Sequence, residues 1–131
     1  MNISKFTQKS VQAVQDLEKV AYEYGNQEVE QEHLLYALLT QEDSLILKLI
    51  EKMEINKDYF INTVKKALDA KVKVSGGDLR FGQYLNKSLV NAENEAKAMG
   101  DEYVSVEHLF LSLLTQPSPS MKKIFNEFGI T

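Results

Sequence analysis

The sequence of 131 residues contains no cysteine and only two prolines. The absence of cysteine excludes disulfide bonds, thiolate zinc sites and cysteine nucleophiles, and it fits a reducing compartment. The opening MNISKFTQKS lacks a basic region followed by an apolar stretch, so we expect no secretory signal and a cytoplasmic location. The longest apolar runs, at 34–39 and 45–50, are far shorter than the ~20 residues that cross a bilayer, which argues against a membrane protein.

Positive charge is also in short supply. Lysine and arginine together number 15 against 19 acidic residues, which gives a net charge of −4. Non-specific affinity for nucleic acid comes mainly from clustered basic side chains, so nucleic acid is not an expected partner. We interpret the one basic stretch as scattered, solvated side chains; it comprises Lys65, Lys66, Lys71, Lys73 and Arg80. A chain of this length forms one domain and needs no staple to fold.

Glycines and prolines separate long segments in which apolar residues recur every three or four positions. This periodicity predicts helices at 7–25, 30–41, 44–53, 56–70, 83–99, 105–116 and 120–128. Thr7 is a good N-cap for the first helix, because its side-chain oxygen can accept a hydrogen bond from an amide of the first turn. Only residues 72–74 alternate like a strand, so the predicted fold class is all-α.

The sequence contains an internal repeat. Residues 6–55, moved by 75 positions without a gap, match residues 81–130 with 15 identities, where chance gives about three. Such helical units can pack about a pseudo-twofold axis and cover each other's apolar faces. We therefore predict one domain over 1–131, with repeat 1 at 1–70, a connector at 71–82 and repeat 2 at 83–131. The counterpart of helix 56–70 would begin at Thr131, so we expect repeat 2 to lack its fourth helix.

Residues able to perform chemistry are few. Glu32–His33 and its repeat Glu107–His108 do not have the two histidines, four residues apart, of a helical zinc protease, and a structural role in the first helical turn is the better interpretation. The serines look like helix-surface or cap residues, and no nucleophile elbow or P-loop is present. We therefore expect no enzyme activity, no metal and no cofactor in this chain.

Most aromatic residues occur at helical spacing and are expected in the core. Tyr103 is the exception, because it lies in a loop between Asp101 and Glu102 on one side and the next helix on the other. Its counterpart in the first repeat is Glu28, so the two equivalent surfaces differ chemically. One face of the domain is therefore a candidate for a specialised function.

The stretch FTQKSVQAVQDLEKVAYEYGNQEVEQEHLLYALLTQED, followed by AKAMGDEYVSVEHLFLSLL, resembles the duplicated amino-terminal domain of Clp ATPases, most of all the ClpB-type disaggregases. The resemblance covers essentially the whole chain. It implies an all-α module of a homohexameric AAA+ machine that binds unfolded or aggregated polypeptide. ATP and magnesium would be bound by the ATPase rings of that parent, whereas the isolated domain is expected to be a monomer.

The resemblance also implies a substrate site, an apolar groove with a polar rim at Thr7, Leu89, Asp101, Tyr103 and Glu107. His108 departs from the pattern, since some disaggregases have an apolar residue there, and it would narrow or polarise the groove. Two alternatives remain open. One is the adaptor-binding domain of a ClpC-type unfoldase that feeds a peptidase, and the other is a free-standing helical adaptor protein.

Overall fold

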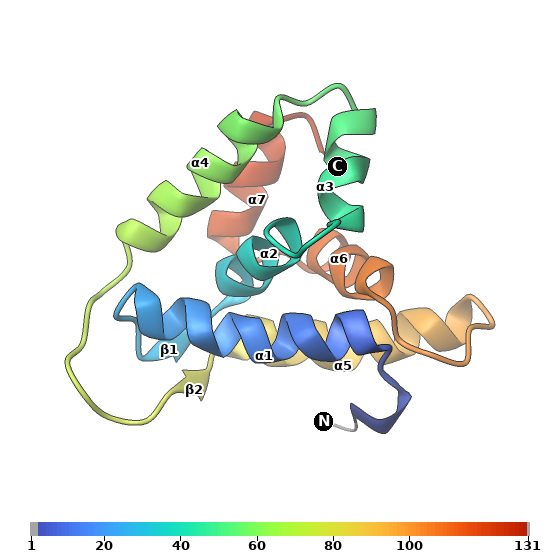
Figure 1. Ribbon diagram of the computed structural model, residues 1–131, viewed down its shortest axis with the longest axis horizontal. Helices are drawn as coiled ribbons and strands as arrows, with labels where there is room; N and C mark the ends of the chain where they lie inside the picture. Colours follow the sequence, from blue (N-terminus) through green and yellow to red (C-terminus); the bar gives the residue numbers. More distant parts are fainter. Residues whose placement is uncertain (1–2, 131) are drawn as a thin grey trace.

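A computed structural model describes residues 3–130, which form seven α-helices and two strands of two residues each (Figure 1). The fold class is all-α, as predicted, and every predicted helix ends within two residues of its observed bounds. The predicted helix that begins at Thr131 lies outside the described residues. The helices are α1 (Gln8–Glu23), α2 (Gln31–Leu39), α3 (Leu45–Lys52), α4 (Lys57–Asp69), α5 (Gln83–Ala98), α6 (Val106–Thr115) and α7 (Pro119–Glu127).

Side-chain caps set the start of several helices. The Thr7 hydroxyl oxygen accepts the amide of Ser10 at 3.2 Å, which confirms Thr7 as the N-cap of α1. Ser44, Asn56 and Ser118 cap α3, α4 and α7 in the same way. The last of these helices begins one residue earlier than predicted, at Pro119, because proline suits the first helical position.

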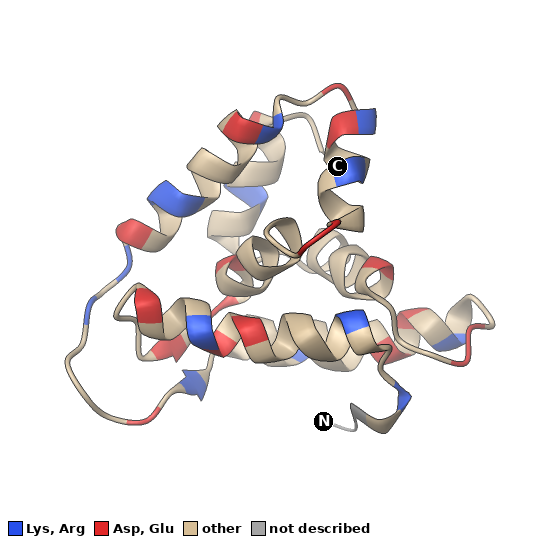
Figure 2. Cartoon of the chain, viewed as in Figure 1, with Lys and Arg blue, Asp and Glu red and all other residues tan. Residues whose placement is uncertain are grey.

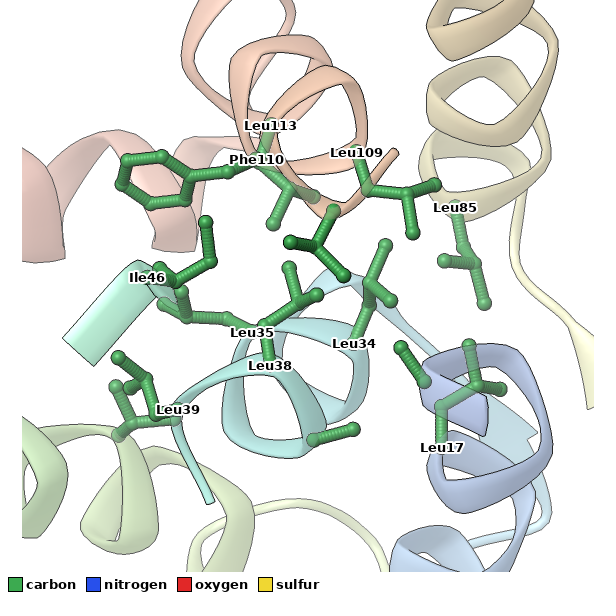
Figure 3. Packing of buried hydrophobic residues seen from close by; sticks show 14 of the residues in the cluster. Leu17, Leu34, Leu35, Leu38, Leu39, Ile46, Leu85, Leu109, Phe110 and Leu113 are labelled. Carbon is green, nitrogen blue, oxygen red and sulfur yellow. The ribbon is translucent and has the colours of Figure 1, made fainter. Parts of the chain in front are cut away.

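The core is built around α2 and α6, which α1 and α5 cover (Figures 1 and 3). Every residue of α2 except Tyr36 is buried, as expected of a helix that is apolar on most of its circumference. Leu34 and Leu38 of α2 meet Leu109 of α6, with Leu17 and Leu85 contributed by α1 and α5 (Figure 3). Neither repeat buries its helices alone, because each one closes the core of the other.

Backbone pairing between the repeats shows the pseudo-twofold relation directly. The Thr7 amide donates to the Val104 carbonyl at 3.0 Å, and the Gly82 amide donates to the Val29 carbonyl at 2.8 Å. The two contacts are equivalent, because Gly82 is the counterpart of Thr7 and Val29 is the counterpart of Val104 at the offset of 75. Strands β1 (Glu28–Val29) and β2 (Arg80–Phe81) extend this second contact as a parallel pair, and Phe6 forms the matching bridge to Val104. Each repeat thus contributes a short segment to the other.

The strands were not predicted, because a two-residue strand is too short to show a period. Residues 72–74, which alternate in the sequence, form no strand. They belong to a segment, residues 71–79, that runs from α4 to β2 around one end of the molecule (Figure 1). The interpretation of the basic stretch as solvated is wrong for Lys71, whose side chain is 15% exposed and whose ammonium lies 2.7 Å from Glu30 and 3.1 Å from Glu32.

Three serines also differ from their predicted surface position. Ser10, Ser88 and Ser112 are fully buried, and each donates a hydrogen bond to a backbone carbonyl. Small hydroxyl side chains can occupy close helix contacts when a carbonyl is within reach. No helix within residues 3–130 combines the length and apolar character needed to span a bilayer.

Candidate functional site

The fold has two pseudo-equivalent corners. The first corner is the 24–30 loop between α1 and α2, together with residues 80–82, and the second corner is the 99–105 loop between α5 and α6, together with residues 5–7. Thr7 is hydrogen-bonded to the 99–105 loop that carries Asp101 and Tyr103, and Glu107 lies in the first turn of α6 next to it. The structure therefore brings four of the five predicted site residues to the second corner.

Leu89 does not join them at the surface. It lies on the buried side of α5 and is only 2% exposed. We expected Leu89 to line an accessible groove, and the structure corrects this expectation. A side chain that the core encloses has no exposed surface for a ligand to contact. Tyr103, by contrast, is 53% exposed, and together with Met99, which is 59% exposed, it presents a large apolar side chain to solvent at the second corner.

His108 holds the 99–105 loop in place. Its Nδ1 accepts the Ser105 amide at 2.9 Å, and its Nε2 lies 2.8 Å from the Asp101 carboxylate. Because Nδ1 accepts a backbone N–H, the ring proton is on Nε2 and is donated to Asp101. The histidine is 4% exposed and reaches no open surface of its own, so the predicted structural role is confirmed for the histidine of this pair.

His33 makes the same contacts at the first corner. Its Nδ1 accepts the Glu30 amide at 2.9 Å, and its Nε2 lies 2.9 Å from the Asn26 side-chain oxygen. Burial lowers the pKa of His33 to about 4, and the positive charge of Lys71 acts in the same direction. His33 is therefore neutral at pH 7. Its partner is an amide, whereas the partner of His108 is a carboxylate, and this is one chemical difference between the corners.

The second corner contains a hollow of about 300 Å³. Its walls are Lys5, Glu93, Ala96, Lys97, Asp101, Glu102 and Val104. Charged side chains therefore dominate a site that was expected to be apolar. Of these residues only Asp101 was predicted. Helical spacing on α5 could have indicated Glu93, Ala96 and Lys97, which lie on the side of the helix that leads to Asp101. No local pattern indicates Lys5, which reaches the hollow by pairing between the repeats.

The second corner presents groups that can make polar, charged and aromatic contacts. It offers acidic side chains, an exposed aromatic ring and a loop fixed by His108. Among residues 3–130, no three histidine or acidic side chains are placed to hold a metal ion. Every buried side-chain nitrogen and oxygen in the described part of the chain has a hydrogen-bond partner. Such a site can hold a peptide through hydrogen bonds, charge and one aromatic contact.

Comparison with known proteins identifies related chains. A family described as the Clp repeat (R) N-terminal domain matches residues 5–128. The chaperone protein ClpB of Nitratidesulfovibrio vulgaris is 38% identical over 137 aligned positions, which cover all of this chain and 16% of that protein. ClpB of Clostridium tetani is 40% identical over 135 positions, covering 99% of this chain and again 16% of the relative. The chain therefore spans only a small part of the length of these relatives.

Solved structures share the fold. The N-terminal domain of Hsp104 from Candida albicans matches 98% of this chain and 84% of its own length, with a TM-score of 0.86 and 22% identity. A ClpV N-domain in complex with a VipB peptide matches 96% of this chain and 80% of its own length, with a TM-score of 0.74 and 20% identity. At these identities the likeness concerns the fold.

Proposed function

Because this chain belongs to the Clp repeat N-terminal domain family, we propose that it is the substrate-recognition module of an ATP-dependent AAA+ disaggregase of the ClpB type. Whole-chain similarity to a part of two proteins named ClpB supports this assignment. In this proposal the domain binds unfolded or aggregated polypeptide in the cytoplasm. ATP and magnesium would be bound by other parts of a homohexameric parent, and the isolated domain would be a monomer.

One observation carries the proposal: the second corner has a hollow, and between two of its wall residues, Glu102 and Val104, it presents the exposed aromatic side chain of Tyr103. Tyr103 is 53% exposed, although it belongs to a loop fixed on both sides by the Thr7–Val104 and His108–Asp101 contacts. An exposed aromatic ring on a fixed loop can pack on apolar side chains that folded proteins keep buried. Asp101 and Glu107 are exposed beside it and can accept hydrogen bonds from an unfolded backbone.

Magnitudes favour weak binding. A contact of roughly 300 Å² of apolar area contributes about 7 kcal/mol at ~25 cal/mol per Å². Ordering a flexible client removes about 2 to 5 kcal/mol of this. The remainder of about 2 to 5 kcal/mol corresponds to a dissociation constant of roughly 0.2 mM or weaker, which suits a module that must pass its client on.

The test is a titration of the isotope-labelled chain with a protein kept unfolded by alkylation of its cysteines, followed by amide chemical shifts. We expect shifts at Asp101, Tyr103 and Glu107, with no shifts when the same protein is added in its folded form. Tyr103→Ala should weaken binding severalfold, whereas the matched control Tyr22→Ala, which removes a ring that is 73% exposed on α1, should not. Shifts confined to other surfaces would overturn the site.

An adaptor-binding function is the second candidate, and one observation favours it. A ClpV N-domain with this fold has been solved with a VipB peptide, so the fold accepts a defined segment of a specific protein. A ClpC-type unfoldase domain, or a free-standing adaptor, would use its surface in that way. Binding that is equally strong for the folded and unfolded forms of a test protein would favour this candidate over the disaggregase.

A further inference from the structure

The first corner is occupied by a segment of the chain itself. Residues 71–79 cross it as a strap, a segment without regular secondary structure that hydrogen bonds hold in place. The Val74 amide donates to the Gly25 carbonyl at 2.9 Å, and the Asn26 side-chain amide donates to the Val72 carbonyl at 3.1 Å. The first corner therefore shows which groups of this fold can bind the backbone of an irregular segment.

Side chains of the same segment add ion pairs and a cation–π contact, whereas Val72 and Val74 are 79% and 42% exposed. Lys71 pairs with Glu30 and Glu32 at the start of α2, and the ammonium of Lys73 lies 5.4 Å from the centre of the Tyr24 ring. Burial by itself would lower the pKa of Lys71, but the hydrogen bond that its ammonium donates to Glu30 and the charges of both glutamates raise it above its usual value. In the sequence KVKV, the first lysine thus contacts two carboxylates and the second contacts an aromatic ring, and a valine follows each lysine.

The second corner has the same framework and is not crossed by any segment of residues 3–130. Gly100 repeats the left-handed backbone of Gly25, with φ of 72° against 69°. The Gly100 carbonyl accepts no hydrogen bond from residues 3–130, although its counterpart accepts the strap. The hollow of the second corner is lined in part by Ala96, Asp101 and Glu102. At the first corner, the counterparts of these residues lie beside the strap; they are Ala21, Asn26 and Gln27.

Charge at the second corner favours a basic occupant. The loop and helix ends carry four acidic side chains, at positions 93, 101, 102 and 107, against two lysines at 5 and 97 (Figure 2). Glu107, the counterpart of Glu32, is exposed and has no ion pair within residues 3–130. Asp101 is the counterpart of Asn26, whose side-chain amide donates a hydrogen bond to the strap. An ionised carboxylate can only accept hydrogen bonds. The second corner therefore favours a ligand that donates hydrogen bonds more strongly than the first corner does.

We propose that the second corner binds client segments in which lysine or arginine occupies alternate positions, docked on the Gly100 carbonyl as the 71–79 segment docks on the Gly25 carbonyl. This inference rests on the proposed function and names its preferred substrate. The Gly100 carbonyl accepts a backbone amide of the client, as Gly25 does from Val74. Glu107 and the free oxygen of Asp101 accept its basic side chains, and the hollow takes an apolar side chain.

The experiment compares two labelled peptides of equal length that differ only in charge, one containing two KVKV blocks and one containing two EVEV blocks. We expect the KVKV peptide to bind at least tenfold more tightly, to lose affinity as salt is added, and to shift the amides of Gly100, Asp101 and Glu107. Glu107→Gln should weaken its binding severalfold. Glu127→Gln, which removes an exposed acidic side chain on α7, should leave it unchanged.

The outcomes separate this inference from the function on which it rests. If unfolded protein shifts the second corner but the two peptides bind equally, the charge preference is wrong and the proposed function stands. If neither peptide nor unfolded protein binds, the proposed function fails as well. Shifts at Gly25 and Asn26 in place of Gly100 and Asp101 would mean that the peptide displaces the strap, which would overturn the assignment to the second corner.

Discussion

Acid should destabilise this domain through His33. The ring is fully buried, and its Nδ1 accepts the Glu30 amide while Nε2 donates to Asn26. Protonation places a second hydrogen on the ring and turns Nδ1 from acceptor into donor, so the Glu30 contact is lost. The folded-state pKa of about 4 lies below the ordinary value of 6.5. The unfolded chain therefore binds more protons between these values, and stability falls as pH drops from 6.5 to 4.

The magnitude follows from the size of the shift. A difference of one pKa unit corresponds to about 1.4 kcal/mol, so a pKa of about 4 in place of 6.5 amounts to ~3 kcal/mol. This stability is fully present above pH 6.5 and is lost by pH 4. For a domain of this size the loss is a large fraction of the total free energy of unfolding.

Urea unfolding at a series of pH values, for the wild-type chain and for His33→Gln, measures this term. Glutamine at the third helical position can still accept the Glu30 amide, as in a capping box, but it does not titrate. The wild-type free energy of unfolding should therefore fall more steeply with acid than that of the variant. Parallel curves for the two proteins would refute the reasoning. So would an imidazole resonance of His33 that titrates near pH 6.5.

Three further results are expected from unfolding measurements. Lys71→Met should cost about 3 kcal/mol, because it leaves the 2% exposed Glu32 carboxylate unpaired, and adding Glu32→Gln should restore part of the loss. Leu89→Ala should cost about 2 to 4 kcal/mol, as for a core leucine; a change below 1 kcal/mol would mean that Leu89 is a surface residue. Gly100→Ala should cost about 1 kcal/mol through its positive φ, and an unchanged midpoint would contradict that conformation.

Much of the fold could be predicted because its signals are local. Apolar spacing and caps such as Thr7 placed the helices, and the offset of 75 anticipated a contact pattern that recurs between the halves. The matched environments of His33 and His108 follow from the same repeat. Local periodicity reports which side of a helix is buried, so it works wherever the buried partner is also a helix.

The candidate site was predicted only in part, for physical reasons that individual residues show. Leu89 was placed at the surface by resemblance, but the face of α5 that carries it packs into the core. Lys71 gave no sign of burial, because its partners Glu30 and Glu32 lie about forty positions away. Lys5 reaches the hollow through a backbone bridge between the repeats, which no local pattern encodes.

The sequence by itself determined that this is an all-α, duplicated domain, because helix periodicity and an internal repeat are properties of the order of residues. Its similarity to the Clp N-terminal family is carried by particular residues that match, and not by the periodicity. Only the tertiary structure decided what distinguishes the two halves. The first corner is crossed by residues 71–79, whereas no segment of residues 3–130 crosses the second corner, which is acidic. Which segment crosses which corner depends on the path of the chain after α4, and that path is set by packing and by the buried Lys71 ion pairs.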